Sequence, residues 1–265
     1  MKKIIFLTTY RDISLFNNLY QSINKYCKNP FTIISVHQQK IYFDKINIIN
    51  NIIKISAPHV SLSKARNIGL EYIYDNDIYF DFILFPDDDS TYDEGLFDYI
   101  EILDVSKSYL IGVKNDCDKK EFRKQFYFSK KLNKYNFNLA CSVNMIINRS
   151  ILKKHIKFDE NLGIGSMNGS SEDLDFYYRM NDFSKFEYNN KLYSLHPKIM
   201  FNELNKILSY TDGYVYFLKK HNIFYFFIFL LFRNFIAINL AFLKLDKKLI
   251  TYNFKLLKYR LNKWI

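Results

Sequence analysis

Cysteine is scarce in this sequence, and its spacing argues against the structural roles that it most often has. The three cysteines, Cys27, Cys117 and Cys141, lie far apart, form no CxxC pair and have no histidine at zinc-ligand spacing. We therefore expect free thiols in a reducing cytoplasm, rather than a disulfide or a structural zinc site.

A long apolar leader and a flexible linker are also missing. The chain starts MKKIIFLTTYRD, with only four apolar residues after the basic pair, whereas the apolar part of a signal peptide needs roughly 7–15 residues. We interpret Ile4 to Leu7 as part of a first strand. The 265 residues show no internal repeat, and 49% of them are hydrophobic, so the chain is long enough to bury a sizeable core.

Acidic residues are nearly absent from the C-terminal part. From Gly213 to Ile265 the only acidic residue is Asp246, and +9 of the formal net charge of +11 lies there. We therefore divide the chain into a domain at 1–212 and a basic, aromatic-rich helical tail at 213–265, for which an anionic membrane surface is the expected partner.

The tail also contains an apolar run, Ile223 to Phe232, that Arg233 and Asn234 interrupt. The run is about half the ~20 residues that a membrane-spanning helix requires. A membrane-spanning helix and an ordinary core-packing helix both remain alternative interpretations of this run. An interfacial helix, with its apolar face in lipid and its basic residues at the headgroups, fits the pattern best.

Before residue 213, strand-like apolar runs alternate with helix-compatible segments, and this alternation predicts a mostly parallel α/β sheet flanked by helices. In such sheets ligands bind at the carboxyl ends of the strands. The expected strands are Lys3 to Thr8, Phe31 to Val36, Ile52 to Ile55, Phe82 to Phe85 and Ser142 to Ile147, and the expected helices are Ser14 to Tyr26, Ser63 to Tyr74 and Gly95 to Val105.

Three consecutive aspartates, Asp87, Asp88 and Asp89, follow the fourth expected strand in FILFPDDDSTY. Their mutual repulsion costs stability unless a positive charge lies among them. In an extended segment Asp87 and Asp89 project to one side, a spacing that suits Mg²⁺ or Mn²⁺ and a metal-bound phosphate. The alternative is an acidic turn that caps the next helix, since Asp93 is a plausible N-cap.

Two further segments carry charge at the start of an expected helix. In HVSLSKARNIGLEYI, Ser63 is the expected cap, Gly69 permits close packing on a strand, and Arg66 lies in the first turn, where the helix dipole disfavours a cation unless an anionic ligand is present. An exposed basic turn is the alternative. In SSEDLDFYYR, Glu172 or Asp173 is a candidate general base, although acids also favour a helix N-terminus in their own right.

The last candidate is His196 in YSLHP. A lone histidine is more often structural, but a neutral imidazole can complete a metal shell. His196 is therefore a possible third ligand beside the two aspartates.

Taken together, LSKARNIGL, FPDDDSTY, FDENLGIG and SSEDLDFYYR followed by LHP resemble, in order and approximate spacing, the family 2 glycosyltransferases of the GT-A fold, and more narrowly those of the bacterial surface-polysaccharide type. The resemblance covers about Lys3 to Pro197. It implies an inverting enzyme, dependent on Mn²⁺ or Mg²⁺, that moves a sugar from a nucleotide diphosphate donor, a UDP-sugar for preference, to a hydroxyl of a saccharide or lipid-linked acceptor.

The resemblance also implies roles for individual residues. Asp89 is then the main metal ligand, with Asp87 near the metal or ribose, Asp173 the base and Glu172 its neighbour. Residues around the nucleotide would include Asp88 and Arg66, and the rim of its pocket would be Thr8, Thr9, Tyr10 and Arg11.

The sequence departs from the family pattern at two places. The aspartate that often ends the second strand is absent from TIISVHQQK, so Ser35, His37 or Gln38 must substitute, and the identity of the base stays open. The usual glycine before the acidic pair is Ser171 here.

Two rival functions can be weighed from the sequence. A sugar nucleotidyltransferase normally has a glycine-rich phosphate loop after the first strand, and TTYRDISLF contains no glycine. A non-catalytic membrane-surface, nucleotide-binding or nucleic-acid-binding protein would account for the basic tail but leaves Asp87, Asp89 and Asp173 without a purpose. We therefore expect a cytoplasmic enzyme, peripherally bound to the inner face of the membrane, with no nucleic-acid partner.

Overall fold

The protein is described here by a computed structural model that covers residues 1–39, 46–121, 131–197 and 204–265. It divides into two compact units. The first comprises residues 1–160 and 173–199, and the second residues 161–172 and 200–265.

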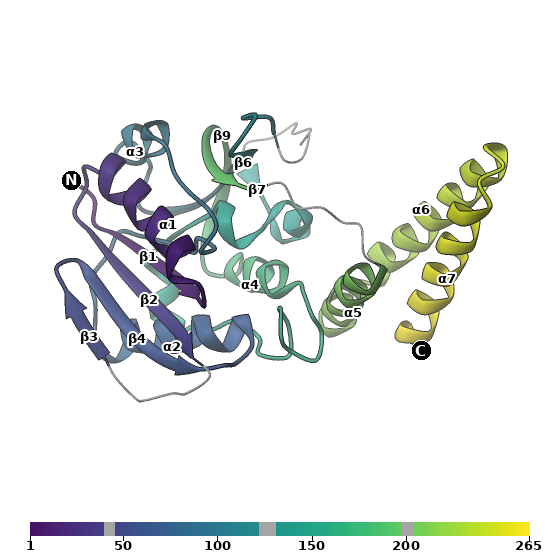
Figure 1. Ribbon diagram of the computed structural model, residues 1–265, viewed down its shortest axis with the longest axis horizontal. Helices are drawn as coiled ribbons and strands as arrows, with labels where there is room; N and C mark the ends of the chain where they lie inside the picture. The colour runs from purple at the N-terminus through teal and green to yellow at the C-terminus, as the bar shows by residue number, and fades with distance from the viewer. Residues whose placement is uncertain (40–45, 122–130, 198–203) are drawn as a thin grey trace. The chain divides into compact units, whose positions relative to one another are not determined.

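The first unit is built on one sheet, in which the described residues form nine strands in the order β3-β4-β2-β1-β5-β8-β6-β9-β7 (Figure 1). Strand β8 is antiparallel to both β5 and β6, so β6 and its parallel neighbour β9 run in the same direction as β1, β2, β4 and β5. The carboxyl ends of these six strands therefore share one edge. The strands are β1 (Ile4–Tyr10), β2 (Phe31–Gln39), β3 (Ile46–Ile49), β4 (Ile52–Pro58), β5 (Phe82–Leu84), β6 (Lys107–Asn115), β7 (Lys131–Leu132), β8 (Met145–Asn148) and β9 (Lys185–His196).

The predicted fold class, a mostly parallel α/β sheet flanked by helices, is confirmed. The four leading apolar runs form β1, β2, β4 and β5, and the fifth overlaps β8. The sequence analysis missed β3, β6, β7 and β9. Two of these strands, β6 and β9, end at the edge where ligands bind in such sheets.

Helices cover both faces of the sheet (Figure 1). On one face α1 (Ile13–Tyr26) and α3 (Glu94–Ile100) enclose a core in which Phe16 and Phe97 pack with Phe6 of β1. Side chains alternate along a strand, so the neighbouring Leu7 points to the other face, which α2 (Leu62–Asp75) covers. A Cβ atom added to Gly69 of α2 would lie 2.2 Å from Leu7 Cδ1, which confirms the close packing expected of this glycine.

The start of α2 differs from the prediction by two residues. The N-cap is Ser61, whose hydroxyl accepts from the backbone N–H of Lys64 at 3.3 Å, whereas Ser63 lies inside the helix and is fully buried. The hydroxyls of Ser61 and Ser63 could both cap a helix, so the sequence alone does not distinguish them. In the structure Ser63 is buried inside the helix, and Ser61 is the cap.

The remaining short elements of the first unit connect β6, β8 and β9. They are the 3₁₀ segments η1 (Lys134–Leu139), η2 (Ser142–Asn144) and η3 (Arg149–Lys154), and the helix α4 (Glu172–Met180), whose first residue belongs to the second unit.

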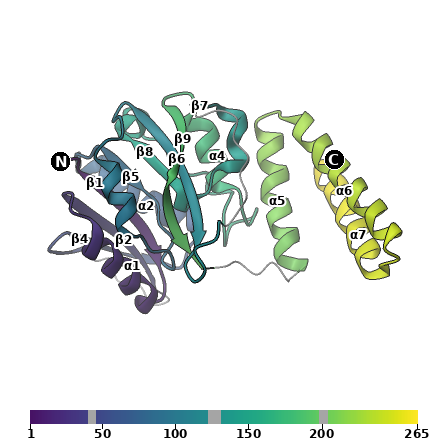
Figure 2. The same ribbon diagram turned by 90° about the horizontal axis from the view of Figure 1, so that it is seen from above.

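The second unit consists of the loop at 161–172 and the helices α5 (Leu204–Lys220), α6 (Phe224–Leu243) and α7 (Lys247–Trp264). Helices α6 and α7 lie side by side as a hairpin (Figures 1 and 2). Among the described residues, α6 is the one helix whose length and composition would let it cross a membrane. The predicted boundary between residues 212 and 213 falls inside α5, and the division into a catalytic domain and a tail stays a prediction.

The side chain of Asn67 ties α2 to the segment after η3. Its amide donates to the carbonyl of Phe158 and to Glu160 Oε1, both at 3.0 Å, and its oxygen accepts from the Phe158 N–H at 2.8 Å. We expect Asn67→Ala to lower the free energy of unfolding by about 1–3 kcal/mol, because it leaves buried backbone groups unpaired. Urea unfolding measures this loss. The exposed Asn76, which bonds the Tyr72 carbonyl at 2.9 Å, is the control, and equal losses for both alanine variants would contradict the assignment.

Ser171 has a backbone φ of 68°, in the left-handed region that favours glycine. A glycine at this position, as in the resembling family, would relieve the strain. We expect Ser171→Gly to raise the thermal unfolding midpoint by about 2–4 °C. Ser170→Gly is the matched control: it removes the hydrogen bond that the Ser170 hydroxyl donates to the Tyr210 carbonyl, so it should lower the midpoint. A fall for both variants would show that φ is not the controlling factor.

Candidate active site

The three aspartates lie in a tight turn after β5, at the carboxyl edge of the sheet. The Ser90 hydroxyl donates to the Asp87 carbonyl at 2.7 Å, which closes the turn. The next residue, Thr91, exchanges two backbone hydrogen bonds of 2.9 Å with Leu195 near the end of β9. This bridge brings the turn beside His196, the last residue of β9.

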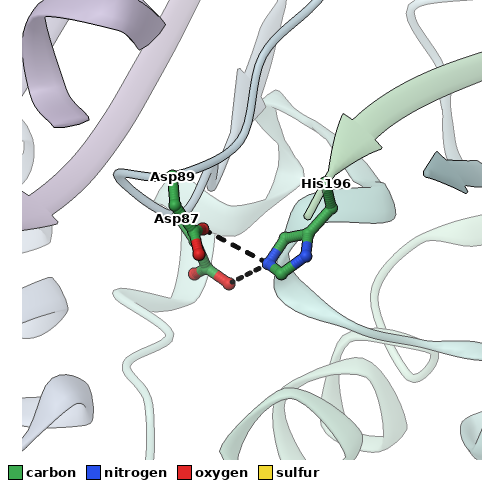
Figure 3. Close-up of side chains that lie close together, drawn as sticks. All are labelled: Asp87, Asp89 and His196. Carbon is green, nitrogen blue, oxygen red and sulfur yellow. Dashed lines mark ion pairs between the residues drawn. The ribbon is translucent and has the colours of Figure 1, made fainter. Parts of the chain in front are cut away.

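Asp87, Asp89 and His196 form a group of potential metal ligands (Figure 3). His196 Nε2 lies 3.7 Å from Asp87 Oδ2 and 3.3 Å from Asp89 Oδ1, and the three ligand atoms lie within 4.8 Å of one another. Carboxylate oxygens are the donors that Mg²⁺ and Mn²⁺ prefer, and a neutral imidazole is a common further ligand. The donor set therefore fits a divalent cation.

The second ring nitrogen of His196 fixes the orientation of the ring. Nδ1 lies 2.7 Å from the carbonyl oxygen of Pro197, to which it can donate, so Nε2 is directed at the aspartates. This arrangement is typical of metal-bound histidines, whose other N–H usually donates to a carbonyl or carboxylate. Burial alone would lower the pKa of His196, but the two aspartates and the Pro197 carbonyl raise it to about 9.

Asp87 is held from three sides. Its Oδ1 accepts from Arg66 Nη2 at 2.8 Å and from the Ser142 hydroxyl at 3.4 Å, while Oδ2 faces His196. Burial would raise the pKa of Asp87, but His196 and the Arg66 charge lower it below its usual value. Arg66 is 1% exposed and lies 5.3 Å from the ring centre of Phe158, so it is a buried partner of Asp87 and does not belong to an exposed basic turn.

The other two aspartates have raised pKa values. Burial and the charges of Asp89 and Asp87 raise the pKa of Asp88 to about 6, and burial raises that of Asp89 despite the opposing charge of His196. The charge of Asp116, directly after β6, also raises the pKa of Asp89. Additional negative charge therefore gathers here, as expected of a site for a cation.

The sequence reading missed Asp116. Its Oδ1 is buried without a hydrogen-bond partner among the described residues, and its backbone N–H donates to the His196 carbonyl at 3.2 Å. A single aspartate after an unrecognised strand gives no signal. Knowing that β6 ends at Asn115 would have drawn attention to it.

The carboxylates of α4 have separate environments. Asp175 is fully buried and pairs with Arg179 at 2.7 Å, so it anchors the helix. Asp173 Oδ1 accepts from the Leu174 N–H at 2.9 Å and is not a member of the potential metal group, and Glu172 is 7% exposed in the second unit.

An aromatic cluster packs α4 against the segment that follows β5. Phe176, one helical turn after Asp173, stacks on Phe158 with ring centres 4.2 Å apart and meets Phe85 edge-on at 5.5 Å. Residues three apart on a helix share a face. Since Phe85 precedes Asp87 by two residues, the start of α4 lies on the same side of the sheet edge as the aspartates.

The predicted nucleotide residues lie at the ends of β1 and β2. Thr8, Thr9 and Tyr10 are the last residues of β1, and Arg11 follows, with its backbone N–H bonded to Asp88. Within β1 Thr8 is fully buried and its hydroxyl has no partner among the described residues, while the ring of Tyr10 stacks on His37 at 4.6 Å.

The three β2 candidates differ in position. Ser35 is fully buried, and its hydroxyl donates to the Ile53 carbonyl at 3.4 Å within the sheet. Gln38 lies at the edge, where its side-chain oxygen accepts from the Val60 N–H at 3.2 Å and from Arg11 Nη2 at 3.3 Å. Gln38 is therefore better placed than Ser35 to replace the aspartate that the family often carries.

Comparison with known proteins gives a match in structure but not in sequence. No model of a protein family matches the chain, and no curated protein matches its sequence. A crystal structure of Staphylococcus aureus TarS, covering residues 1–349, superposes with a TM-score of 0.55 at 17% identity, over 83% of this chain and 72% of that one. The same protein in complex with UDP-GlcNAc gives 0.56 and 18%, over 82% and 65%.

A second similar structure is a mannosyltransferase from Pyrobaculum calidifontis in complex with GDP-Man and Mn²⁺. Its TM-score is 0.54 at 10% identity, over 83% of this chain and 64% of that one. This chain thus spans about two thirds of the length of these solved chains, and at such identities the likeness concerns the fold. The protein has the GT-A fold seen in these glycosyltransferases.

Proposed function

We propose that this protein is a metal-dependent inverting glycosyltransferase. It moves a sugar from a nucleotide diphosphate sugar, with a UDP-sugar as the favoured donor, to a hydroxyl of a saccharide or lipid-linked saccharide in cell-surface glycan synthesis. The observation that carries the proposal is the group of Asp87, Asp89 and His196 at the carboxyl edge of a GT-A sheet. The nucleotide-sugars bound to the two similar proteins, and the Mn²⁺ bound to one of them, support it.

In this proposal Asp89, Asp87 and His196 hold the cation, which is Mn²⁺ or Mg²⁺. When bound, the cation supplies positive charge that stabilises the departing diphosphate. Arg66 and Ser142 keep Asp87 in place, and the Pro197 carbonyl keeps Nε2 of His196 directed at the two carboxylates. Rigid support of this kind limits the rearrangement needed when the donor binds.

The nucleotide occupies the ends of β1 and β2. Thr8 and Thr9 support the floor of this pocket from inside β1, and Tyr10, Arg11 and Asp88 line its rim. His37, stacked on Tyr10, and Gln38, bonded to Arg11, face the base or ribose. Ser35 contributes as part of the sheet.

Asp173 is the general base, with Glu172 as its neighbour. The acceptor hydroxyl attacks the anomeric carbon of the donor while Asp173 takes the hydroxyl proton. A new carbon–oxygen bond forms, and the bond from the anomeric carbon to the diphosphate oxygen breaks with its electron pair leaving on the diphosphate. Attack on the face opposite the leaving group inverts the configuration.

Replacement of the base tests this step. We expect Asp173→Asn to lower the transfer rate by about 10²–10⁴-fold, because the amide cannot accept the proton, while donor affinity stays the same. Asp182→Asn, at an exposed position just beyond α4, is the control. Rates come from product formation and affinity from donor titration. A wild-type rate in Asp173→Asn would remove this residue from the role.

Metal dependence has a test of its own. We expect donors from a panel of nucleotide-sugars to raise the melting temperature only with Mn²⁺ or Mg²⁺ present, and EDTA to abolish transfer. Asp89→Asn should remove both effects, whereas Asp98→Asn, whose carboxylate pairs with Lys28 at 3.9 Å on α3, should keep them. Donor stabilisation in EDTA would contradict the metal assignment. Metal-dependent binding without any turnover would favour a non-catalytic nucleotide-binding protein.

We further propose that the protein is cytoplasmic and associates with the inner face of the membrane through its basic C-terminal tail. The excess of +9 charge between Gly213 and Ile265, together with the apolar helix α6, supports this association. Such a location would give access to a lipid-linked acceptor.

A further inference from the structure

The α6–α7 hairpin has an unusual distribution of polarity, with polar side chains between its two helices. Asn234 and Asn253 are 3% and 6% exposed, and the Asn234 amide donates to the Asn253 carbonyl at 2.7 Å. Arg260 of α7 donates to the Asn234 side-chain oxygen. Burial lowers the pKa of Arg260 to about 10. The helices are therefore joined by a polar contact as well as by apolar packing of Phe227 and Trp264, whose ring centres are 4.1 Å apart.

The outer side of α6 is apolar instead. Phe229, Phe232 and Phe235 are each more than half exposed, at 58%, 57% and 59%. With Tyr225, Ile236 and Leu240 they recur at helical spacing on the side of α6 that points away from the buried Asn234, a side that also carries the exposed Asn239. Only 22% of the most apolar window of α6 is buried, so α6 is not an ordinary core helix. Soluble proteins rarely expose so many large apolar side chains side by side.

The apolar face of α6 continues onto α7. Phe242 and Phe254 meet edge-on with ring centres 6.3 Å apart, and both are about half exposed. The face of α6 therefore reaches the neighbouring helix at this contact.

The cations of the hairpin border this face. Arg233 and Lys244 are eleven residues, about three turns, apart and therefore lie on the same flank of α6, next to the apolar side chains. On α7, Lys247 and Lys258 lie on the same side as Phe254, seven residues before it and four residues after it. Charge beside an apolar face suits a surface that is apolar inside and anionic at its rim. Arg233 halfway along α6 also disfavours a spanning orientation, since a flanking arginine can reach the headgroups only when the helix lies in the interface.

We propose that the hairpin docks on an anionic lipid bilayer as a unit, with the outer face of α6 inserted among the acyl chains, the lysines of α7 at the headgroups, and the Asn234–Asn253–Arg260 contact holding the helices together. The inference rests on the membrane association proposed above and is independent of the proposed glycosyl transfer. Insertion, and not charge alone, then provides the attachment.

Trp264 gives a direct measurement, because it is the only tryptophan in the chain and lies beside Phe224 and Phe227 in the hairpin. The full-length protein is mixed with vesicles of phosphatidylcholine and phosphatidylglycerol whose acyl chains carry bromine. We expect quenching of Trp264 fluorescence and flotation with the vesicles that persists in about 1 M NaCl, where the Debye length falls to about 3 Å.

Two triple variants separate insertion from attraction between charges. Replacement of Phe229, Phe232 and Phe235 by serine should lower the vesicle partition coefficient by about tenfold or more, because it removes three aromatic rings from lipid. The control replaces three exposed apolar residues of the first unit, Ile102, Val105 and Phe183, by serine and should bind as the wild type does. Circular dichroism and metal-dependent donor binding verify that each variant is folded.

The possible contrary results are distinct. Binding that salt abolishes, without quenching and without an effect of the phenylalanine variant, would overturn insertion while leaving the proposed membrane association in place. Absence of binding to any vesicle would overturn both. A wild-type dimer in solution that the phenylalanine variant converts to a monomer, with vesicle binding unchanged, would assign the face to a second copy of the chain. None of these results decides the glycosyl transfer, which donor binding and turnover test separately.

Discussion

The ion pair between Arg66 and Asp87 is the constraint on which the candidate site depends. A buried guanidinium is tolerated only when a carboxylate and further hydrogen bonds compensate its charge, and loss of either partner leaves an uncompensated charge. Asp87 lies 2.8 Å away, and the same carboxylate is shared with Ser142 and His196. One side chain thus links the start of α2, the end of β5 and the end of β9.

This sharing also explains how three aspartates can be adjacent. Arg66 and His196 compensate the negative charge of Asp87, and His196 partly compensates the charge of Asp89. The compensation is incomplete, because the pKa values of Asp88 and Asp89 are still raised. A site with residual negative charge at the edge of a sheet is poised to take up a cation, and the fold places it where ligands bind in related sheets.

The sequence predicts the part of the site whose residues are neighbours in the chain. β5 and its aspartates lie in one continuous segment, and the apolar runs of β1, β2 and β4 are bounded by polar turns, so both can be read directly. The position of His196 depends instead on the pairing of β9 with β6, where the register shifts between Ile111 and Gly112, and on the Thr91–Leu195 bridge. No local pattern encodes these contacts. The partnership of Arg66 with Asp87 was hidden for the same reason. The sequence analysis placed Arg66 in the first turn of the helix and expected an anionic ligand beside it, whereas α2 starts at Leu62 and a carboxylate of the protein itself pairs with Arg66.

The C-terminal hairpin shows how a local reading can merge two different roles. In the sequence, Arg233 and Asn234 together interrupt an apolar run and argue against a spanning helix. In the structure the helix continues through both, and the two residues face different surroundings: Asn234 points inward to Asn253 and Arg260, while Arg233 lies exposed on a flank. Arg233 and Asn234 therefore lie on different sides of one continuous helix, and neither of them ends it. Burial of the Asn234 amide and exposure of several phenylalanines on the same helix is the reverse of the distribution that water favours, and the proposed contact with lipid rests on this pattern.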